Sequence, residues 1–439
     1  MAKPKLALIP AAQGTKFYSV LPSDGVGDFT FARGSVATRI NAQGLIENVA
    51  SGQSRLDYPM IDGVQKGCPH HILEPARTNL VKYSESFSQS YWAKTRASIT
   101  SNSTISPDGS SNASKLIEDT ANGSHFLLVQ PVYTTSSVNN VVSLSLFAKK
   151  SERDLQIQSF ASGGGENPKL NFDLTNGTAT SVGTGATPTF SIQSFGNDWF
   201  RCSLTYTVSQ SNSGVRFYIS MVNNNSSSYQ GDGSSGFYIW GAQLEIGSFP
   251  TSYIPTSGQS SGVTRSAETA NGAGNASTFN DSEGVLFAEF NTLSINPASS
   301  RYIGISNGSA DNRIAIRQPS GADNQVSFFA VVGGSVQVNL THTLNILNFN
   351  KIAVKYKVND FALWVNGVEV LTDTSGSVPA EGTFNKLDFA NFNGSSLPFE
   401  GNTKQVQYFD SAIADTQLEQ LTSWTSFTDM ANGQLYTIE

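Results

Sequence analysis

Short stretches in which apolar and polar residues alternate recur along most of the chain. Val142, Leu144 and Leu146 point to one face of such a stretch, and Ser143 and Ser145 point to the other. This is the period of a half-buried strand. Gly- and Asn-rich breaks separate the stretches, and helical periodicity is nearly absent. The pattern predicts an all-β chain built from antiparallel β-sandwiches.

The spacing of these stretches divides the chain into four parts. Residues 1–70 hold short extended runs and are expected to form a small β-rich amino-terminal segment for attachment or oligomerisation. Residues 71–256 are expected to form a jelly-roll sandwich. Residues 257–280 are small and polar and are predicted to be a linker. Residues 281–439 are expected to form a second sandwich with a short carboxy-terminal helix.

Two local signals in the second sandwich are sharp. Asn366–Gly367 can take positive φ at both residues and predicts a tight hairpin turn. Asp415–Ser423 is predicted to be a helix, with Leu418 and Leu421 on one face and Asp415 placed to cap it.

An apolar, aromatic-rich stretch at 236–244 is predicted to be the closing strand of the first sandwich. Trp240 lies inside it and is expected to be a core residue. The proline-containing segment 250–256 follows, and proline disfavours helix in the residue before it. We expect this strap to fix the two sandwiches relative to each other.

The composition narrows the function. Of 439 residues, 14% are charged and 38% are hydrophobic, and the net charge is -7. Phosphate binding needs clustered Lys and Arg, so an acidic chain without a basic run is not expected to bind nucleic acid. No apolar run approaches the roughly 18 residues that a membrane span needs. The apolar run before Pro10 is too short for a signal peptide, so none is expected.

Candidate chemistry is sparse. Cys68 and Cys202 are expected to be free thiols of a reducing cytosol, although a single bridge between them is an alternative. His70 and His71 are adjacent, and neighbours on a strand point to opposite faces, so they form a poor metal chelate. The carboxylates are scattered without the pairing that glycoside hydrolysis needs. We therefore expect no enzyme activity and name no catalytic residue.

Several motifs resemble a known group of proteins. The first half resembles bacteriophage virion proteins of the tail-fibre or receptor-binding kind, and also the jelly-roll carbohydrate-binding modules of secreted glycanases. The second half is similar to laminin-G-like, concanavalin-A-like lectin domains. The motifs of the first half are 73–80, 83–87 with Trp92, 196–202, 238–245 and 250–256, and those of the second are 363–368, 399–401 and 406–415.

The resemblance implies a structural protein of a phage virion, made in the host bacterial cytoplasm. It would be an oligomer, commonly a trimer in such fibres, that joins other virion proteins through its amino-terminal segment and recognises a host-surface glycan. A purely structural decoration of capsid, collar or tail is the first alternative. A polysaccharide depolymerase is the second. These implications are analogies of fold.

Five residues are candidates for ligand or metal contacts. Tyr229 follows an Asn- and Ser-rich loop and is expected to contact a glycan, and Trp92 and Trp199 are further candidates because an aromatic face stacks on a pyranose ring. Jelly-roll modules of the resembled kind often hold a structural calcium ion through oxygen ligands. Glu85 and Glu245 are the matching candidates for that ion.

Overall fold

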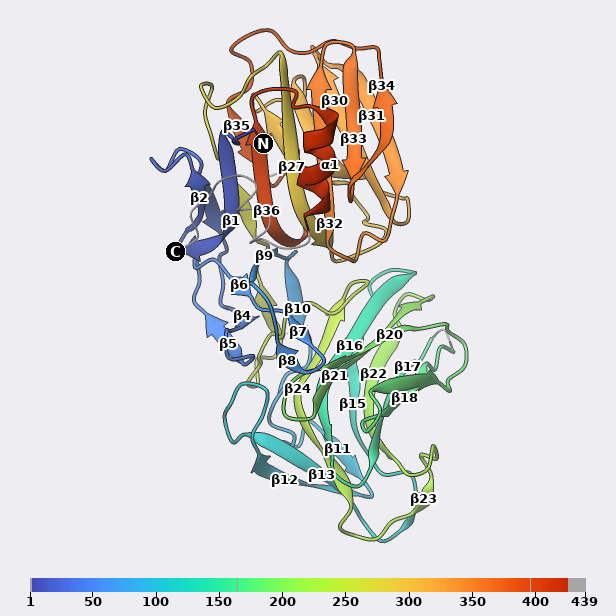
Figure 1. Ribbon diagram of the computed structural model, residues 1–439. Helices are drawn as coiled ribbons and strands as arrows, with labels where there is room; N and C mark the ends of the chain where they lie inside the picture. The colour runs from blue at the N-terminus through green and yellow to red at the C-terminus, as the bar shows by residue number, and fades with distance from the viewer. Residues whose placement is uncertain (1, 164, 395, 425–439) are drawn as a thin grey trace.

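A computed structural model of the chain describes residues 2–163, 165–394 and 396–424. Two β-sandwiches lie one above the other, and strands from the amino-terminal segment run beside the upper one and through the waist (Figure 1). The expected all-β class is confirmed. Among the described residues, no helix has the length and hydrophobicity to cross a bilayer.

The first sandwich consists of two six-stranded antiparallel sheets. One runs in the order β11 (Ala93–Thr95), β15 (Phe126–Thr134), β22 (Gly214–Val222), β17 (Asp154–Ala161), β18 (Lys169–Asp173) and β19 (Thr178–Ser181). The other runs β12 (Ala97–Thr104), β13 (Ala113–Glu118), β24 (Gly236–Ile246), β16 (Asn140–Lys150), β21 (Trp199–Val208) and β20 (Thr189–Ser194). A short ladder of β14 (Asn122–Gly123) and β23 (Tyr229–Gln230) lies at its far tip.

The two faces of β16 belong to different cores. Val142, Leu144 and Leu146 are buried between the sheets, as the alternation predicts. Phe147 points outward and packs with Trp240 in a second apolar layer. The hairpin of β4 (Ala37–Ile40) and β5 (Ile46–Val49) covers this layer, so this part of the amino-terminal segment packs on the outside of the first sandwich.

The second sandwich has a long sheet and a short one. The long sheet runs β26 (Thr269–Asn271), β3 (Phe29–Ala32), β2 (Lys16–Leu21), β1 (Leu6–Gln13), β36 (Gly401–Phe409), β27 (Glu283–Thr292), β32 (Asn350–Lys357), β33 (Asp360–Val365) and β34 (Val368–Asp373), with β9 (His70–Leu73) and β6 (Leu56–Asp57) joined through β36. The short sheet runs β31 (Ser335–Thr343), β30 (Gln325–Val332), β29 (Arg313–Gln318), β28 (Arg301–Ser306) and β35 (Lys386–Asp388).

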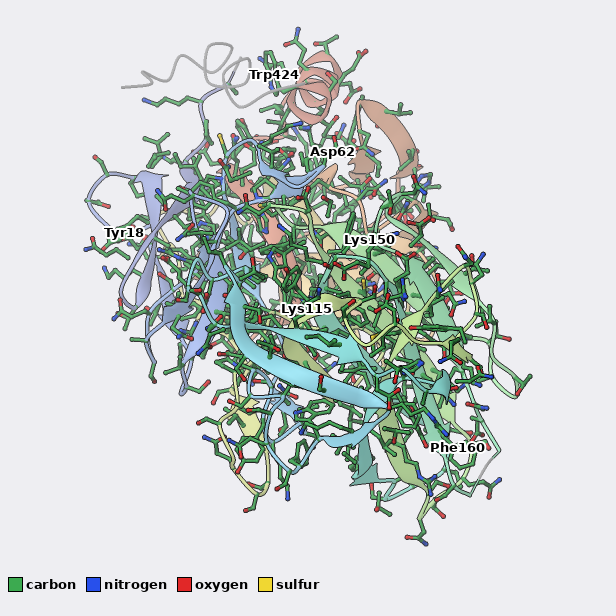
Figure 2. The ribbon with its side chains drawn as sticks, turned by 90° about the horizontal axis from the view of Figure 1, so that it is seen from below. Tyr18, Asp62, Lys115, Lys150, Phe160 and Trp424 are labelled. Atoms are coloured by element: carbon green, nitrogen blue, oxygen red, sulfur yellow. The ribbon has the colours of Figure 1, made fainter. Side chains whose placement is uncertain are left out.

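The amino-terminal segment is an integral part of this second sandwich. Leu6, Leu8 and Phe17 are fully buried in its core, because β1 and β2 complete the long sheet beside β36. Burial of these side chains holds the segment against the second sandwich. The alternation in the sequence alone could not show which strands they pack against. Its expected role in attachment stays a prediction. Exposed Tyr18 of β2 lies at an outer margin of the molecule (Figure 2).

The interval 257–280 also differs from a free linker. It contains β25 (Val263–Arg265), which pairs with β10 (Arg77–Asn79), and β26, which pairs with β3. A further small ladder joins β7 (Met60–Ile61) and β8 (Val64–Gln65). Backbone hydrogen bonds to earlier strands hold a segment whose small polar side chains resemble those of a linker.

The helix α1 (Asp415–Ser423) has the predicted bounds, and Leu418 and Leu421 pack on the outer face of the long sheet. The predicted cap is wrong. Ala414 occupies the capping position without a side-chain bond, and Asp415 lies in the first turn, where its carboxylate is 3.1 Å from Lys355 Nζ. The hairpin turn is confirmed, with Asn366 and Gly367 both at positive φ.

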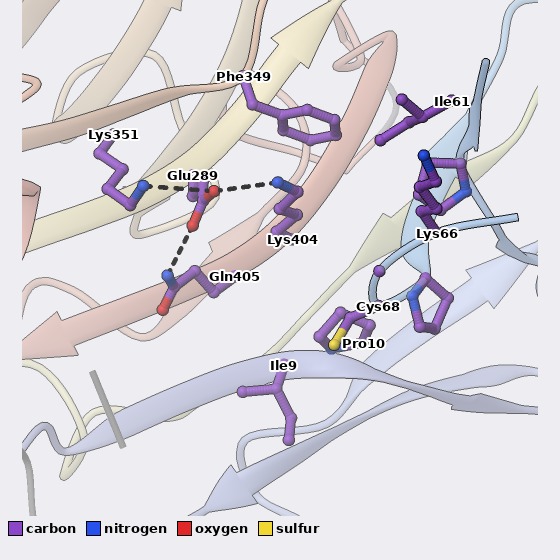
Figure 3. Close-up of a pocket in the computed structure, with 13 residues that line it drawn as sticks. Ile9, Pro10, Ile61, Lys66, Cys68, Glu289, Phe349, Lys351, Lys404 and Gln405 are labelled. Atoms are coloured by element: carbon purple, nitrogen blue, oxygen red, sulfur yellow. Dashed lines mark hydrogen bonds and ion pairs between the residues drawn. The ribbon is translucent and has the colours of Figure 1, made fainter. Parts of the chain in front are cut away.

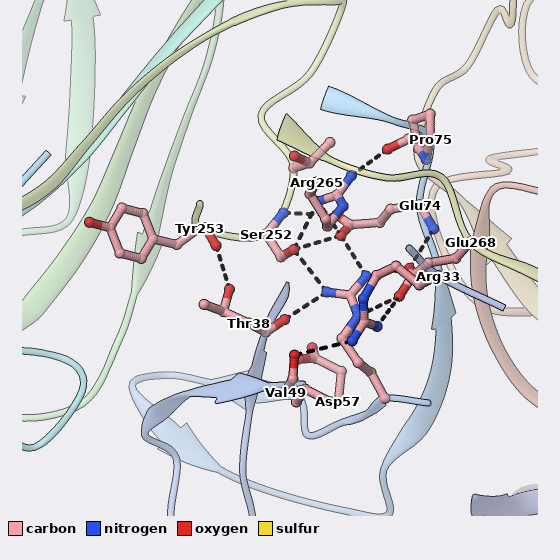
Figure 4. A network of polar contacts seen from close by, with 12 residues as sticks. Arg33, Thr38, Val49, Asp57, Glu74, Pro75, Ser252, Tyr253, Arg265 and Glu268 are labelled. Carbon is pink, nitrogen blue, oxygen red and sulfur yellow. Dashed lines mark hydrogen bonds and ion pairs between the residues drawn. The ribbon is translucent and has the colours of Figure 1, made fainter. Parts of the chain in front are cut away.

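A buried cluster of charges, here called the ionic junction, joins segments from both halves of the chain at the waist (Figure 4). Glu268 accepts from Arg33 Nη1 and from Arg55 Nε, each at 2.8 Å. Arg55 Nη2 lies 2.8 Å from Glu74 Oε2, and Arg265 Nη1 lies 2.7 Å from the same oxygen. These side chains are at most 3% exposed.

The strap enters the ionic junction through Ser252. Its backbone N–H donates to Glu74 Oε1 at 2.8 Å, and its hydroxyl accepts from Arg55 at 2.9 Å and Arg265 at 3.0 Å. Tyr253 beside it packs against Trp240. The strap therefore connects the outer layer of the first sandwich to the charges that hold the waist.

Candidate functional site

A pocket opens where strand β36 changes its neighbour. Along one edge of β36, Val406 pairs with Leu8 of β1, whereas Thr403 pairs with His71 of β9. Between those pairings β1 and β9 diverge, and a pocket of about 550 Å³ lies there. It is lined by Ile9, Pro10, Pro59, Ile61, Lys66, Gly67, Cys68, Pro69, Glu289, Phe349, Lys351, Lys404 and Gln405, and is called the Phe349 pocket below (Figure 3).

One wall of the Phe349 pocket is a cross-strand row of polar side chains. Lys351 lies opposite Glu289, and Glu289 lies opposite Gln405, so the three point from adjacent strands to one face. Gln405 Nε2 donates to Glu289 Oε2 at 2.8 Å, and Lys351 Nζ is 3.6 Å from Glu289 Oε1. The row offers an ammonium, a carboxylate and an amide side by side.

A β-bulge adds a second cation to this wall. The register between β27 and β36 shifts after Glu289, which leaves Lys404 as an extra residue between the partners of Glu289 and Phe290. Bulges re-aim side chains in this way. Lys404 Nζ lies 3.4 Å from Glu289 Oε1 and 4.2 Å from the centroid of the Phe349 ring. Two ammonium groups thus share one carboxylate beside an aromatic ring.

The facing wall is apolar apart from Lys66. Ile9 and Pro10 come from β1, and Ile61 comes from the β7–β8 hairpin, which also brings Cys68 to the rim (Figure 3). Cys68 is exposed and free, whereas Cys202 is buried and free.

The two histidines behind the pocket point to opposite faces, as predicted. His71 stacks on Phe17 in the core with ring centroids 3.9 Å apart, and His70 contacts the edge of Phe349 at 5.6 Å. Burial lowers the pKa of His70 to about 3, with Lys404 and His71 adding to the effect, and burial lowers that of His71 to about 4. Both imidazoles are neutral at pH 7 and add no charge to the pocket.

Tyr229 lies at the far tip of the first sandwich, away from this pocket. Its hydroxyl donates to Glu118 Oε2 at 2.7 Å, and its ring lies between Arg153, 5.4 Å from the centroid, and His125, at 4.9 Å. Burial, followed by Glu118, raises the pKa of Tyr229. The ring and hydroxyl are engaged by the protein, although the residue is only half-buried.

The structure places Trp92 and Trp199 where no sugar can reach them, which corrects both expectations. Each is 1% exposed. Trp92 packs in the sandwich core and its Nε1 donates to the Tyr83 carbonyl, while Trp199 lies in the outer apolar layer and bonds the Ile105 carbonyl. Both indoles are large apolar groups with a satisfied N–H, and neither presents a ring face.

The expected calcium ligands also have protein partners. Glu245 is fully buried and accepts from Thr251 N and Gln243 Nε2, both at 2.8 Å. Glu85 accepts from the Tyr253 hydroxyl at 2.8 Å. Burial raises the pKa of both carboxyls. In the part of the chain that the structure describes, no three His, Cys, Asp or Glu side chains gather as a metal site.

A second hollow of about 560 Å³ lies between β20–β21 and the loop around Ile295. Its wall is rich in hydroxyls, of which Ser191 and Ser203 bond each other at 2.7 Å. The Phe349 pocket presents ammonium groups beside an aromatic ring and is the stronger candidate.

Sequence patterns did not single out the residues of the Phe349 pocket. Glu289, Lys351 and Lys404 read as ordinary surface charges of separate strands, and only the pairing of β27, β32 and β36 brings them together. The available signal was the polar run 402–405 within a strand that continues into apolar residues.

Comparison with known proteins gives likenesses of fold. No protein family and no curated protein matches the chain. The carbohydrate-binding module CBM40 of the Ruminococcus gnavus IT-sialidase is 18% identical, with a TM-score of 0.29 over 34% of this chain and 87% of that one. Domain 4 of AbnA, an arabinanase from Geobacillus stearothermophilus, is 12% identical, with a TM-score of 0.29 over 36% and 73%. Mouse laminin alpha1 domains LG4-5 are 13% identical, with a TM-score of 0.22 over 67% and 90%.

These three solved structures are β-sandwich modules, as this chain's two halves are. At these TM-scores the likenesses carry no further conclusion.

Proposed function

We propose that the chain is a non-catalytic carbohydrate-binding protein and that the Phe349 pocket holds one sugar residue of a glycan. The observation that carries the proposal is the juxtaposition of the Phe349 ring with the row Lys351–Glu289–Gln405 and the bulged Lys404 on one wall. A sugar ring has an apolar C–H face and a rim of hydroxyls, and this wall offers a partner to each.

The polar partners suit hydroxyl groups. Lys404 and the Gln405 amide donate hydrogen bonds, and Glu289 accepts them, so a hydroxyl that both donates and accepts can join the existing row. The pocket volume of about 550 Å³ lies within the roughly 300–1,000 Å³ typical of small-molecule sites. Glu289 is the single carboxylate among the described residues that line it, which favours binding over glycoside hydrolysis by a carboxylate pair.

The wider setting is a second part of the proposal. We propose that the chain is a virion protein of a bacteriophage, in a trimeric tail fibre or similar appendage, and that the glycan is on the host surface. The motif resemblance in the sequence supports this setting. Particles labelled by an antibody to the chain test it, and unlabelled particles would refute it. If loss of the chain halts assembly, or loosens particles that still adsorb normally, a structural decoration is the better description.

The binding test uses the full chain on an array of bacterial surface glycans. Phe349→Ala and Gln405→Ala are expected to weaken binding to the best glycan at least tenfold. Phe160→Ala is the matched control, because Phe160 is also half-buried with a cation on its ring, Arg216 at 5.3 Å, but lies on the first sandwich. Binding to no glycan, or equal binding by all three variants, would contradict the proposal.

Cys68 supplies a direct readout at the pocket. A bound glycan should slow the reaction of a maleimide with this rim thiol, and Phe349→Ala should abolish the protection. A glycan that binds with unchanged labelling would place the site elsewhere. Release of reducing ends from the glycan would show that the chain is a depolymerase instead.

A further inference from the structure

The outer face of the short sheet carries two arginines stacked on aromatic rings. Arg313 and Arg317 are two residues either side of Ala315 on β29, and Ala315 lies opposite Phe329 on β30. The two guanidinium groups therefore straddle one ring. Their central carbons lie 5.2 Å and 4.3 Å from its centroid. Arg313 also lies 5.6 Å from the ring of Phe392, so it is held between two aromatic groups.

These two half-buried arginines lack the carboxylate partners that the arginines of the ionic junction have. In the described chain, Arg313 has neither a hydrogen bond nor an ion pair, and Arg317 bonds only neutral groups, Asn339 Oδ1 at 2.7 Å and Ser327 Oγ at 3.4 Å. The Nε atoms of both are buried without a partner. Arg55, by contrast, has two carboxylates within the ionic junction.

Both arginines are half-exposed, so donors without a protein partner are open to water or to a ligand. Burial is the main effect on the pKa of Arg313 and lowers it, and neighbouring Arg317 lowers it further, while Tyr302 and Asp311 raise it. Among the described residues, no carboxylate lies within ion-pair distance of Arg313. Stacking on aromatic rings fixes the planes of both guanidinium groups. A fixed guanidinium with free donors is suited to a planar carboxylate, which it can bind through two parallel hydrogen bonds.

We propose that Arg313 and Arg317 form a second site that binds the carboxylate of an acidic glycan on the outer face of the short sheet. Beside the arginines, β31 presents two exposed uncharged side chains, Asn339 and Thr341, and Thr341 bonds the buried Ser327 at 2.9 Å. Amides and hydroxyls in a flat row suit the hydroxyls of a sugar chain better than the apolar side chains of a peptide. The partner is thus a polysaccharide with uronic-acid-type residues.

This site goes beyond the function proposed for the Phe349 pocket and does not depend on it. The Phe349 pocket lies on the outer face of the long sheet, and the arginines lie on the outer face of the short sheet, on the other side of the shared core. A glycan bound at one site leaves the other free. Failure of either proposal is therefore separable from failure of the other.

Titration calorimetry of the full chain with trigalacturonic acid tests the proposal, with the methyl-esterified trisaccharide as the uncharged match. Binding of the acid is expected to be at least tenfold tighter than that of the ester and to weaken as salt rises. Arg313→Gln and Arg317→Gln should each weaken it at least tenfold. Arg313→Lys keeps the positive charge but removes the planar guanidinium, so it should weaken binding as much as Arg313→Gln does.

Two control variants and an acidic peptide probe make the result decisive. Lys3→Gln removes one exposed positive charge elsewhere and should leave binding unchanged. Phe349→Ala should also leave it unchanged, which separates this site from the pocket. Equal affinity for acid and ester, unchanged binding by Arg313→Gln and Arg313→Lys, or tighter binding of hexaglutamate than of the sugar would overturn the proposal, the last in favour of an acidic peptide.

Discussion

Arg55 and Glu268 are 213 residues apart in the chain and meet as a fully buried ion pair at the waist, with Arg55 Nε 2.8 Å from Glu268 Oε1. Arg55 precedes β6 and Glu268 precedes β26, so the pair joins two segments that both enter the long sheet. Each member of the pair has a further ionic partner: Glu74 lies beside Arg55, and Arg33 lies beside Glu268.

Removing one member of that pair should destabilise the waist strongly. Arg55→Met leaves Glu268 and Glu74 short of a cation in a buried site, and we expect a loss of about 3–5 kcal/mol in the free energy of unfolding. Urea denaturation checks it. The control is Arg39→Met, because the Arg39–Glu47 pair is partly exposed and should be worth no more than about 1 kcal/mol. Equal small losses would contradict a structural role for the junction.

The junction also predicts acid sensitivity. Burial alone would raise the pKa of Glu74, but Arg265 and Arg55 hold it at about 2, below its ordinary 4.5. A lowered folded-state pKa contributes stability that is present above about pH 4.5 and is lost as pH falls toward 2. The melting temperature should fall over that window. In Glu74→Gln this part of the acid dependence should be missing.

The pKa of Asp57 is shifted in the opposite direction to that of Glu74, so its effect on stability depends on pH in the opposite way. Burial raises its pKa to about 6 from 3.8, and the Ile40 N–H and Arg55 only partly offset this. The charged carboxylate therefore destabilises the fold increasingly as pH rises from about 4 to 6. Asp57→Asn should stabilise the protein by about 2–3 kcal/mol at pH 7, with no gain at pH 4. Unfolding at both pH values checks it, and Asp62→Asn, at an exposed turn, should change neither.

Thiol reactivity should distinguish the two cysteines. Cys68 is exposed at the pocket rim, whereas Cys202 lies in the first core, where burial raises its pKa. The thiolate is the reactive form, so a maleimide should modify one thiol per native chain and two after denaturation. Mass spectrometry after brief labelling measures this. Rapid modification of Cys202 in the native chain would mean that the first sandwich opens readily.

The placement of Trp92 in the core, rather than at a sugar-binding surface, can be tested by the stability of a variant. Because the indole is buried among Phe87 and Phe217, Trp92→Ala should destabilise the first sandwich by about 3–5 kcal/mol. Thermal unfolding checks it. A variant that lost glycan binding while keeping full stability would restore Trp92 as a sugar contact.

The placement of β1 predicts that the amino-terminal segment supports the second sandwich. Leu8→Asp puts a charge into that core and should expose apolar surface, measured by ANS fluorescence. Val20→Asp on β2 is the control, because Val20 is exposed. If Leu8→Asp left the second sandwich intact, residues 1–70 would be the independent segment that the sequence suggested.

Local patterns were a good guide to local structure. The alternation around Leu144, the Asn366–Gly367 turn and the bounds of Asp415–Ser423 all depend on neighbours in sequence, and the structure agrees with them. The ionic junction and the Phe349 pocket depend instead on strands far apart in the chain. No period or motif encodes the pairing of β36 with both β1 and β9.

The dependence on distant strands also explains why the sequence predicted sugar contacts for Trp92 and Trp199. An aromatic residue after a loop looks alike in sequence whether its ring faces water or a second apolar layer. Trp199 has such a layer over it, supplied by the distant hairpin at Ile46.

The pairing of β1 (Leu6–Gln13) with β36 (Gly401–Phe409) has a consequence for biosynthesis. Strand β1 can pair with β2 as soon as both are made, but its other neighbour, β36, is synthesised only after the whole first sandwich. The first sandwich, which lies wholly between these strands in sequence, can fold while β1 waits with an open edge. The slow step should therefore be closure of the second sandwich, the point at which a nascent chain is most exposed to edge-to-edge aggregation and to capture by chaperones.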